Sequence, residues 1–448
     1  MMTIPLTARS AMLAASLATL LASAPSLAAP VAHWTQASGV QVYWVPSPSI
    51  PMVDVRIEFD AGDRRDPAGK AGLANTMAAS LSNGVRATAH EPALDENALG
   101  EAWADVGASF SAIASADRLS FSLRSLTEPE LLAKAVTLAA RQMAQPAFPA
   151  AIWQRDRPKW IAALKEADTR PATQVARAFE RAVFGAHPYG AETSPASLMR
   201  IRVQDMVALH VQAVRPCYAK VSVVGALDRA QTDAMVAQLF ARLPASVCPA
   251  LPAVPEVAPL QRAQEQDIVF ASAQAHVLLG QPGYARSDPD HLALMLGNHI
   301  LGGGTESRLT QEIREKRGLT YSVDSSFAPG LRAGAFAISL QTRADQAHQA
   351  LQLARQVLKT FVEDGPSAAE LQDAKDHLIG SFPLLLDGNL KLLDNVANIA
   401  WYGLPLDYLD QWTAEVQQLT VGEIRAAFAR TLQPERMVTV VLGAAAPR

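Results

Sequence analysis

The sequence has few charged residues, few cysteines and no surplus of basic residues. Charged residues make up 18% of the 448 and hydrophobic residues 49%. An intrinsically disordered chain is therefore excluded, because such chains combine low hydrophobicity with high net charge. The 39 basic and 43 acidic residues leave a formal net charge of −4, which argues against a general nucleic-acid-binding protein. The two cysteines exclude a disulfide-dense scaffold and any zinc cluster built from cysteine.

Long apolar runs are absent after the first 30 residues. Within them, Arg9 is the only charged residue, and it precedes an apolar stretch from Ala11 to Ala24 and small residues at 26–29. This order is typical of a secretory signal peptide, and the stretch is shorter than the ~20 residues that a membrane span requires. We expect a signal peptide over residues 1–29 and an exported mature chain without a membrane span. A membrane anchor is the alternative interpretation.

The two cysteines flank a predicted strand and helix. Cys217 opens the strand at 217–225, and Cys248 follows the helix at 229–243. A helix that returns antiparallel to a strand brings its end back beside the strand's start, so a disulfide between Cys217 and Cys248 is geometrically possible. Export to an oxidising compartment would favour it. Two buried free thiols are the alternative, and the sequence does not decide between them.

A proline-rich stretch divides the mature chain into two parts of similar length. Between residues 244 and 264, five prolines recur among alanine and valine with almost no helical or strand period. Such a composition indicates an extended, semi-rigid linker. The sequence thus predicts an N-terminal half at 30–243, a linker at 244–264 and a C-terminal half at 265–448.

The two halves repeat one order of predicted elements. In each, a strand precedes a helix, a second helix and a pair of strands, and further helices lead to a closing strand. We expect these elements at 52–60, 67–83, 94–106, 109–116, 119–126 and 219–224, and again at 275–281, 288–301, 306–316, 320–327, 333–342 and 436–442. The pattern predicts an α+β fold with two homologous halves. Each half would be a mostly antiparallel sheet packed with helices, facing the other across a cavity.

One stretch of the second half combines a glycine hinge with possible hydrogen-bond donors. After the three glycines at 302–304 come a short basic helix, Gly318 as its stop, and a strand. The turn at Gly318 could bring Arg314 and Tyr321 together, as a guanidinium and a phenol that suit a carbonyl oxygen gaining charge. From chemistry alone the signal is weak, because a basic residue near a helix end also favours the helix dipole and a strand tyrosine usually packs.

The same stretch resembles a known protease family. The runs Leu-Gly-Gly-Gly-x-x-Ser-Arg-Leu and Arg-Glu-Lys-Arg-Gly-Leu-x-Tyr-Ser-Val resemble the C-terminal half of the insulinase/pitrilysin/mitochondrial processing peptidase family. Its members are zinc proteases of duplicated α+β halves. The glycine-rich opening at 66–73, the run His187-Pro188-Tyr189-Gly190 and the linker are similar too. The resemblance implies that Arg314 and Tyr321 bind the substrate backbone and stabilise the tetrahedral intermediate.

The metal-binding motif of that family is missing. The family carries H-x-x-E-H on the first helix of its N-terminal half, where two histidines hold zinc and the glutamate acts as general base. By position, Asn75, Ala78 and Ala79 stand in their place, and alanine has no lone pair for a metal or a proton. None of the nine histidines pairs with another at i+4. We therefore expect this chain to bind no metal.

The resemblance implies that the catalytic residues are divided between two chains. In the bacterial branch of the family, one chain supplies zinc and base, and a homologous chain supplies the Arg/Tyr pair. This sequence would be the non-zinc-binding subunit of a periplasmic zinc peptidase, contributing to peptide hydrolysis only with a homologous H-x-x-E-H partner that holds the zinc. The alternative is a catalytically inert peptide-binding or scaffolding homologue. A complete zinc peptidase would need ligands that this chain lacks.

Overall fold

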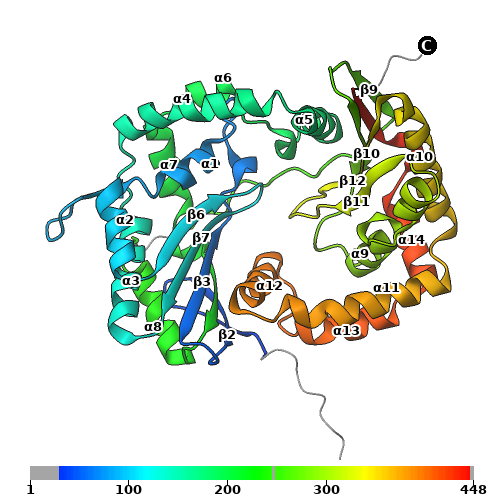
Figure 1. Cartoon of the computed structure of the whole chain (residues 1–448). Helices are drawn as coiled ribbons and strands as arrows, with labels where there is room; N and C mark the ends of the chain where they lie inside the picture. Colours follow the sequence, from blue (N-terminus) through cyan, green and yellow to red (C-terminus); the bar gives the residue numbers. More distant parts are fainter. Residues whose placement is uncertain (1–29, 245–247, 444–448) are drawn as a thin grey trace, which may run out of the picture.

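Two β-sheets with helices packed around them form the framework of the protein (Figure 1). The computed structural model describes residues 30–244 and 248–443. The predicted signal peptide at 1–29 lies outside the described residues.

The N-terminal sheet has six strands in the order β1-β2-β8-β3-β7-β6, and the C-terminal sheet has five in the order β11-β12-β10-β13-β9. The N-terminal strands are β1 (Ala32–Thr35), β2 (Gln41–Pro46), β3 (Met52–Phe59), β6 (Ser109–Ala114), β7 (Leu119–Leu126) and β8 (Lys220–Gly225). The C-terminal strands are β9 (Gln264–Ile268), β10 (Gln274–Pro282), β11 (Thr320–Phe327), β12 (Ala335–Arg343) and β13 (Val438–Leu442). A small hairpin adds β4 (Gly84–Val85) and β5 (Leu94–Asp95).

The strand orders of the two sheets match. Reading β6-β7-β3-β8-β2 against β11-β12-β10-β13-β9 pairs each strand with its counterpart in the other half. In both, the closing strand runs parallel to one neighbour, β8 to β2 and β13 to β9, and the other pairings within these five strands are antiparallel. The predicted fold class, α+β with two homologous halves of mostly antiparallel sheet, is confirmed.

Helices surround both sheets (Figure 1). The N-terminal half contributes α1 (Leu73–Ser80), α2 (Glu96–Asp105), α3 (Pro129–Ala144), α4 (Ala150–Ala167), α5 (Pro171–Phe184), α6 (Pro195–Arg200), α7 (Val203–Ala213) and α8 (Arg229–Phe240). The C-terminal half contributes α9 (His291–Asn298), α10 (Ala347–Asp364), α11 (Ala368–Ser381), α12 (Asn389–Tyr402), α13 (Tyr408–Gln418) and α14 (Val421–Thr431). Within the described ranges, no helix is both long and apolar enough to cross a membrane.

Each half lends one helix to the other. Helix α5 packs on β10 and β13 of the C-terminal sheet, where Val175 and Phe179 share a core with Val438 and Val440. Helix α12 packs on β8, β3 and β2 of the N-terminal sheet. Figure 1 shows both helices lying between the two halves, α5 at the top and α12 at the bottom. The halves are therefore joined by apolar packing as well as by the linker.

Strand β3 explains how α12 sits on a sheet. Its odd positions, such as Val55 and Ile57, are buried in the N-terminal core, whereas Asp54, Arg56 and Glu58 point to the opposite face because side chains alternate along a strand. Arg56 pairs with Asp394 of α12 at 2.8 Å. Burial raises the pKa of Glu58, which pairs with Arg118 at 2.8 Å.

Three local predictions were wrong in extent. The first helix begins at Leu73 rather than near residue 67, because the carboxylate of Asp66 binds the backbone N–H groups that begin α1. The predicted helix at 306–316 is a shorter π-helical segment, Thr310–Glu315. Strand β9 begins at Gln264, the last residue of the predicted linker, and β1 and β2 were not anticipated.

Candidate functional site

The three positions of the missing zinc motif lie on α1 and face a pocket. Asn75, Ala78 and Ala79 line a cavity of about 770 Å³, together with residues of β6, α4 and two loops. We call this cavity the α1 pocket; its other lining residues are Gly72, Ala112, Ile113, Ala114, Lys159, Trp160, Ala163, Leu164 and Thr193.

The α1 pocket offers little that could hold a metal. Its lining has no histidine, cysteine, aspartate or glutamate, the side chains that bind zinc in proteins. Asn75 is turned to a neighbouring side chain and donates from Nδ2 to Asp63 Oδ2 at 3.3 Å. Over the whole described part of the chain, no group of three or more histidine, cysteine, aspartate or glutamate side chains is placed to hold a metal ion.

Asp66 fixes the start of α1. Its carboxylate accepts from the backbone N–H groups of Gly72, Leu73 and Ala74 at 2.7, 2.9 and 2.9 Å. Gly72 has φ +95°, a left-handed conformation that only glycine adopts at little cost. Burial raises the pKa of Asp66 to about 7 although these donors oppose the rise. The segment 66–73 thus contains the residues that cap α1 and orient it, and α1 is the helix on which the zinc motif is missing.

In the C-terminal half, the structure brings Arg314 and Tyr321 together. The guanidinium carbon of Arg314 lies 5.5 Å from the centre of the Tyr321 ring, within the range of a cation–π contact. Tyr321 is 85% exposed, which is unusual for an aromatic side chain on a strand. The Arg314 side chain is about half exposed, and among the described residues Glu315 is the one carboxylate with which it pairs, at 3.3 Å. Both polar ends are therefore available to an approaching molecule.

The glycines before this pair allow a close crossing of backbone. The segment 299–303 is π-helical, and a Cβ on Gly302 would lie 2.4 Å from Ser325 Oγ on β11. Asn298 ties the same two elements, donating to the Ser325 carbonyl at 3.0 Å and accepting from its hydroxyl at 2.8 Å. The glycine run therefore packs against the strand that carries Tyr321.

A buried carboxylate that sequence reasoning missed connects the two halves. Asp117, in the turn between β6 and β7, is 6% exposed. It accepts from Arg64 Nε at 2.5 Å, from Tyr189 Oη at 2.8 Å and from the backbone N–H of Leu331 at 2.9 Å. Leu331 lies in the turn between β11 and β12, so the tips of the two hairpins meet at one carboxylate. We call this set of contacts the Asp117 latch.

The His187-Pro188-Tyr189-Gly190 run belongs to the same latch. The Tyr189 hydroxyl donates to Asp117 and accepts from the backbone N–H of Arg332 at 3.1 Å. His187 lies 2.9 Å from the Pro255 carbonyl through Nε2, and its Nδ1 accepts from the Tyr189 N–H. Because a carbonyl can only accept, Nε2 carries the proton. His187 therefore holds the linker, and it is not placed as a metal ligand.

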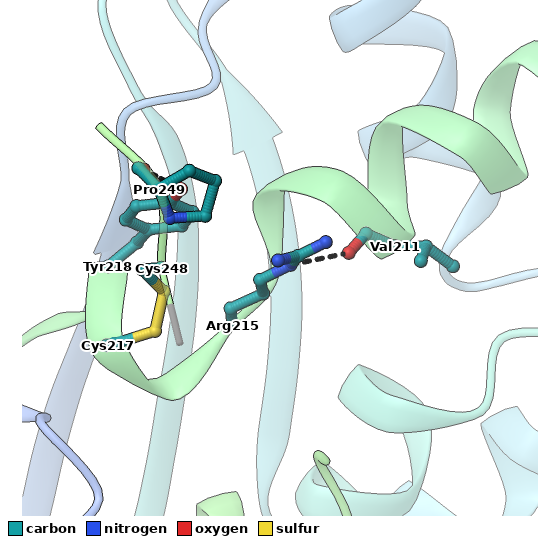
Figure 2. The surroundings of a disulfide bond; sticks show 6 residues. All are labelled: Val211, Arg215, Cys217, Tyr218, Cys248 and Pro249. Atoms are coloured by element: carbon teal, nitrogen blue, oxygen red, sulfur yellow. Dashed lines mark hydrogen bonds between the residues drawn. A yellow bond between two sulfur atoms is a disulfide. The ribbon is translucent and has the colours of Figure 1, made fainter. Parts of the chain in front are cut away.

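The linker is also fastened at its beginning. Cys217 and Cys248 form a disulfide (Figure 2), one of the two alternatives that the sequence left open. Beside it, the hydroxyl of Tyr218 donates to the Pro249 carbonyl. A cross-link between residues 31 positions apart stabilises a fold by roughly 3–4 kcal/mol in the chain-entropy model.

Known proteins with similar sequences and structures identify the family of this chain. Residues 42–196 match the family model described as insulinase (peptidase family M16), and residues 200–378 match the model described as peptidase M16 inactive domain. The crystal structure of a peptidase M16 inactive domain from Pseudomonas fluorescens is 34% identical, with a TM-score of 0.86 over 93% of this chain and 98% of that one. The chain belongs to the insulinase family, peptidase family M16.

Two curated M16 relatives match over shorter stretches. An uncharacterized zinc protease of Streptomyces coelicolor is 36% identical over 38% of this chain and 37% of its own length. A Helicobacter pylori protein named non-peptidase homolog YmxG is 34% identical over 34% of this chain and 35% of its own. These matches span less than two thirds of those relatives. The α1 pocket without metal ligands and the match to the inactive domain mark this chain as an inactive-type M16 homologue.

Proposed function

We propose that this chain is the non-zinc-binding subunit of a two-chain zinc peptidase exported to the periplasm. It supplies Arg314 and Tyr321 to a homologous partner that carries H-x-x-E-H and zinc. The partner's zinc and glutamate activate water, and the guanidinium and phenol of this chain stabilise the oxyanion that forms on the peptide carbonyl.

One observation carries the proposal. Arg314 and Tyr321 are in contact and exposed, whereas positions 75, 78 and 79 hold no metal ligands. A packing role for Tyr321 would bury the ring, and a role for Arg314 at a helix end alone would not require the tyrosine. These observations support a chain that binds the peptide carbonyl and leaves the activation of water to its partner.

Reconstitution with the homologous zinc-bearing chain of the same organism tests the proposal. The isolated chain should hydrolyse no peptide, and the mixture should hydrolyse a fluorogenic peptide. Arg314→Ala or Tyr321→Phe should lower kcat of the mixture by about 10²–10³, the usual cost of losing one oxyanion donor. Arg343→Ala is the matched control, because Arg343 is exposed and pairs only locally with Asp345. Full activity of both variants, or chelator-sensitive hydrolysis by the isolated chain, would contradict the proposal.

A second candidate is a binding or scaffolding protein without chemistry, and the largely apolar α1 pocket favours it. Purification of the native protein from its own cells separates the two functions. A zinc-bearing homologue that co-purifies in fixed ratio supports the two-chain peptidase, and its absence supports the second candidate.

A further inference from the structure

Four large apolar side chains are exposed where α12 begins. The exposed fraction is 60% for Leu384, 50% for Leu385, 46% for Leu390 and 52% for Ile50. The first two end the short helical turn before α12, Leu390 is the second residue of α12, and Ile50 lies in the turn between β2 and β3. We call these four side chains the leucine patch.

Hydrogen bonds hold the two turns of the leucine patch against the start of α12. Ser47, in the turn that carries Ile50, donates from its hydroxyl to the side-chain oxygen of Asn389 at 2.7 Å. Lys391 donates from Nζ to the Leu384 carbonyl at 2.8 Å. The leucine patch is therefore an ordered surface to which both halves of the chain contribute. An exposed apolar patch of this kind usually marks an interaction site.

The charged side chains beside the leucine patch neutralise one another. Lys391 pairs with Asp387 at 2.9 Å, and Asp394 pairs with Arg56 at 2.8 Å. The surface thus offers apolar area without a surplus of either charge. Such a surface fits an apolar partner better than a polyanion or a strongly basic segment.

The described chain begins beside the leucine patch. In the antiparallel ladder between β1 and β2, Ala32 lies opposite Trp44. The start of β1 is therefore at the end of β2 that leads into the turn carrying Ile50. Val31 is buried in one core with residues of α12, and Figure 1 shows β2 beside that helix.

The predicted signal peptide connects this end of the molecule with a membrane. A signal peptide takes the chain to the membrane through which it is exported. Five residues, 25–29, separate its apolar stretch at 11–24 from the described chain, and five residues reach at most about 18 Å. The leucine patch therefore lies close to the bilayer surface while the apolar stretch is in the membrane.

We propose that the leucine patch docks on a lipid bilayer, with its four side chains inserted among the acyl chains just below the headgroups. Docking of this kind holds the mature chain on the membrane surface without a membrane span. The proposal rests on the export proposed above and involves neither Arg314 nor Tyr321. Vesicle binding is measured without a zinc-bearing partner, so this test and the reconstitution test can fail separately.

Co-sedimentation of the purified mature chain with lipid vesicles tests the proposal. One set of vesicles is made of phosphatidylcholine, and the other of phosphatidylethanolamine with phosphatidylglycerol. The test variant combines Leu384→Asp and Leu385→Asp, two exposed positions outside the core. The matched control combines Val207→Asp and Val211→Asp, which are 41% and 60% exposed on α7. Thermal unfolding followed by circular dichroism checks that both variants are folded.

We expect the wild type and the Val207→Asp, Val211→Asp control to bind both kinds of vesicle equally well, in low and in high salt. Binding does not depend on lipid charge because the leucine patch carries no surplus charge. The Leu384→Asp, Leu385→Asp variant should bind about tenfold more weakly or less, because it loses apolar area and would carry two carboxylates into the bilayer.

Four outcomes would overturn the proposal. They are no co-sedimentation of the wild type up to about 1 mM lipid, equal binding by the folded Leu384→Asp, Leu385→Asp variant, an equal loss of binding in the control, and binding to anionic vesicles alone that high salt abolishes. Dimerisation without vesicles that Leu384→Asp and Leu385→Asp prevent would assign the leucine patch to a second copy of the chain and would also overturn it.

Discussion

At the scale of single residues, burial shifts the pKa of side chains that have no distinguishing feature in the sequence. His291 begins α9, and its Nδ1 lies 3.1 Å from the Tyr284 hydroxyl. Burial, and secondarily the charge of Arg286, lowers the pKa of His291 to about 3. The imidazole therefore stays neutral in the folded protein at pH values where it would be protonated in the unfolded chain.

This difference predicts a pH dependence of stability. Because the folded pKa is depressed, the contribution of His291 is fully present above pH 6.5 and is lost as the pH falls toward 3. We expect the free energy of unfolding to fall by about 1–2 kcal/mol more between pH 7 and pH 5 in the wild type than in His291→Asn. Urea unfolding at the two pH values measures the difference. An equal fall in the free energy of unfolding in the wild type and in His291→Asn would contradict the lowered pKa of His291.

Arg314 and Tyr321 show what a residue-level motif can reveal. Their spacing, seven residues apart across Gly318, predicts a turn between them, and the structure brings the side chains into contact. Their role in catalysis comes from the family resemblance and stays a prediction. Asp117 had no such signal, because a single aspartate in a hairpin turn looks like any turn residue until the distant Leu331 is placed beside it.

At the scale of elements, the position of α1 depends on one capping carboxylate. Asp66 binds three backbone N–H groups at the start of the helix, which is more than a usual N-cap provides. At α2 the capping side chain of Asp95 accepts from a single N–H, that of Ala98. The two helices therefore allow the same substitution to be compared at a strong cap and at an ordinary one.

We expect Asp66→Ala to lower the free energy of unfolding by roughly 2 kcal/mol and Asp95→Ala by roughly 1 kcal/mol. The reason is that the first removes an acceptor from three N–H groups, of which only that of Leu73 keeps another acceptor among the described residues, the Lys70 carbonyl, whereas the second removes an acceptor from one. Urea unfolding at pH 8, where the Asp66 carboxyl is ionised, gives both values. A smaller loss in Asp66→Ala than in Asp95→Ala would show that the carboxylate does not hold α1.

Elements with a clear hydrophobic period were predictable, and those without one were not. The strand expected at 109–116 follows from the alternation of Phe110, Ala112 and Ala114, and the structure has β6 there. Strand β9 reads Gln-Glu-Gln-Asp-Ile and is largely exposed. Only its pairing with β13 makes it a strand, and pairing partners are not written in the local sequence.

At the scale of the whole molecule, the Asp117 latch joins the hairpin tips of the two halves. Arg64 is buried at the same carboxylate, so removing Asp117 leaves a buried cation with Asp60 as its remaining partner. The strand that carries Tyr321 is part of the latched hairpin. The latch therefore links the position of the Arg/Tyr pair to the N-terminal half.

We expect Asp117→Ala to destabilise the protein by roughly 3 kcal/mol, since the buried Arg64 loses one of its two carboxylate partners and Tyr189 and Leu331 lose their acceptor. Amide hydrogen exchange of Leu331 should accelerate because its N–H loses its acceptor. Exchange of Arg332 should accelerate because Tyr189, its acceptor, loses the carboxylate that holds the hydroxyl in place. Asp345→Ala, which breaks an exposed pair with Arg343, serves as the control and should leave exchange unchanged. Unaltered exchange at Leu331 in Asp117→Ala would show that the hairpin is held by other contacts.

The duplication was predictable from sequence, but the way the halves are joined was not. The repeated order of elements and the proline-rich segment indicate two units from the sequence alone. The exchange of α5 and α12 was not predictable, because the apolar face of a helix shows that it is buried but not which sheet it covers.

The exchange of α5 and α12 determines when each half can finish folding during synthesis. A chain that emerges N-terminus first completes β8 at residue 225, yet the helix that belongs on β8, β3 and β2 spans residues 389–402. Until α12 is synthesised, one face of the N-terminal sheet stays uncovered. Helix α5 likewise lacks β10 and β13, the strands on which it packs. The protein should therefore finish folding in one late step and should depend on chaperones that shield these surfaces while the rest of the polypeptide is delivered.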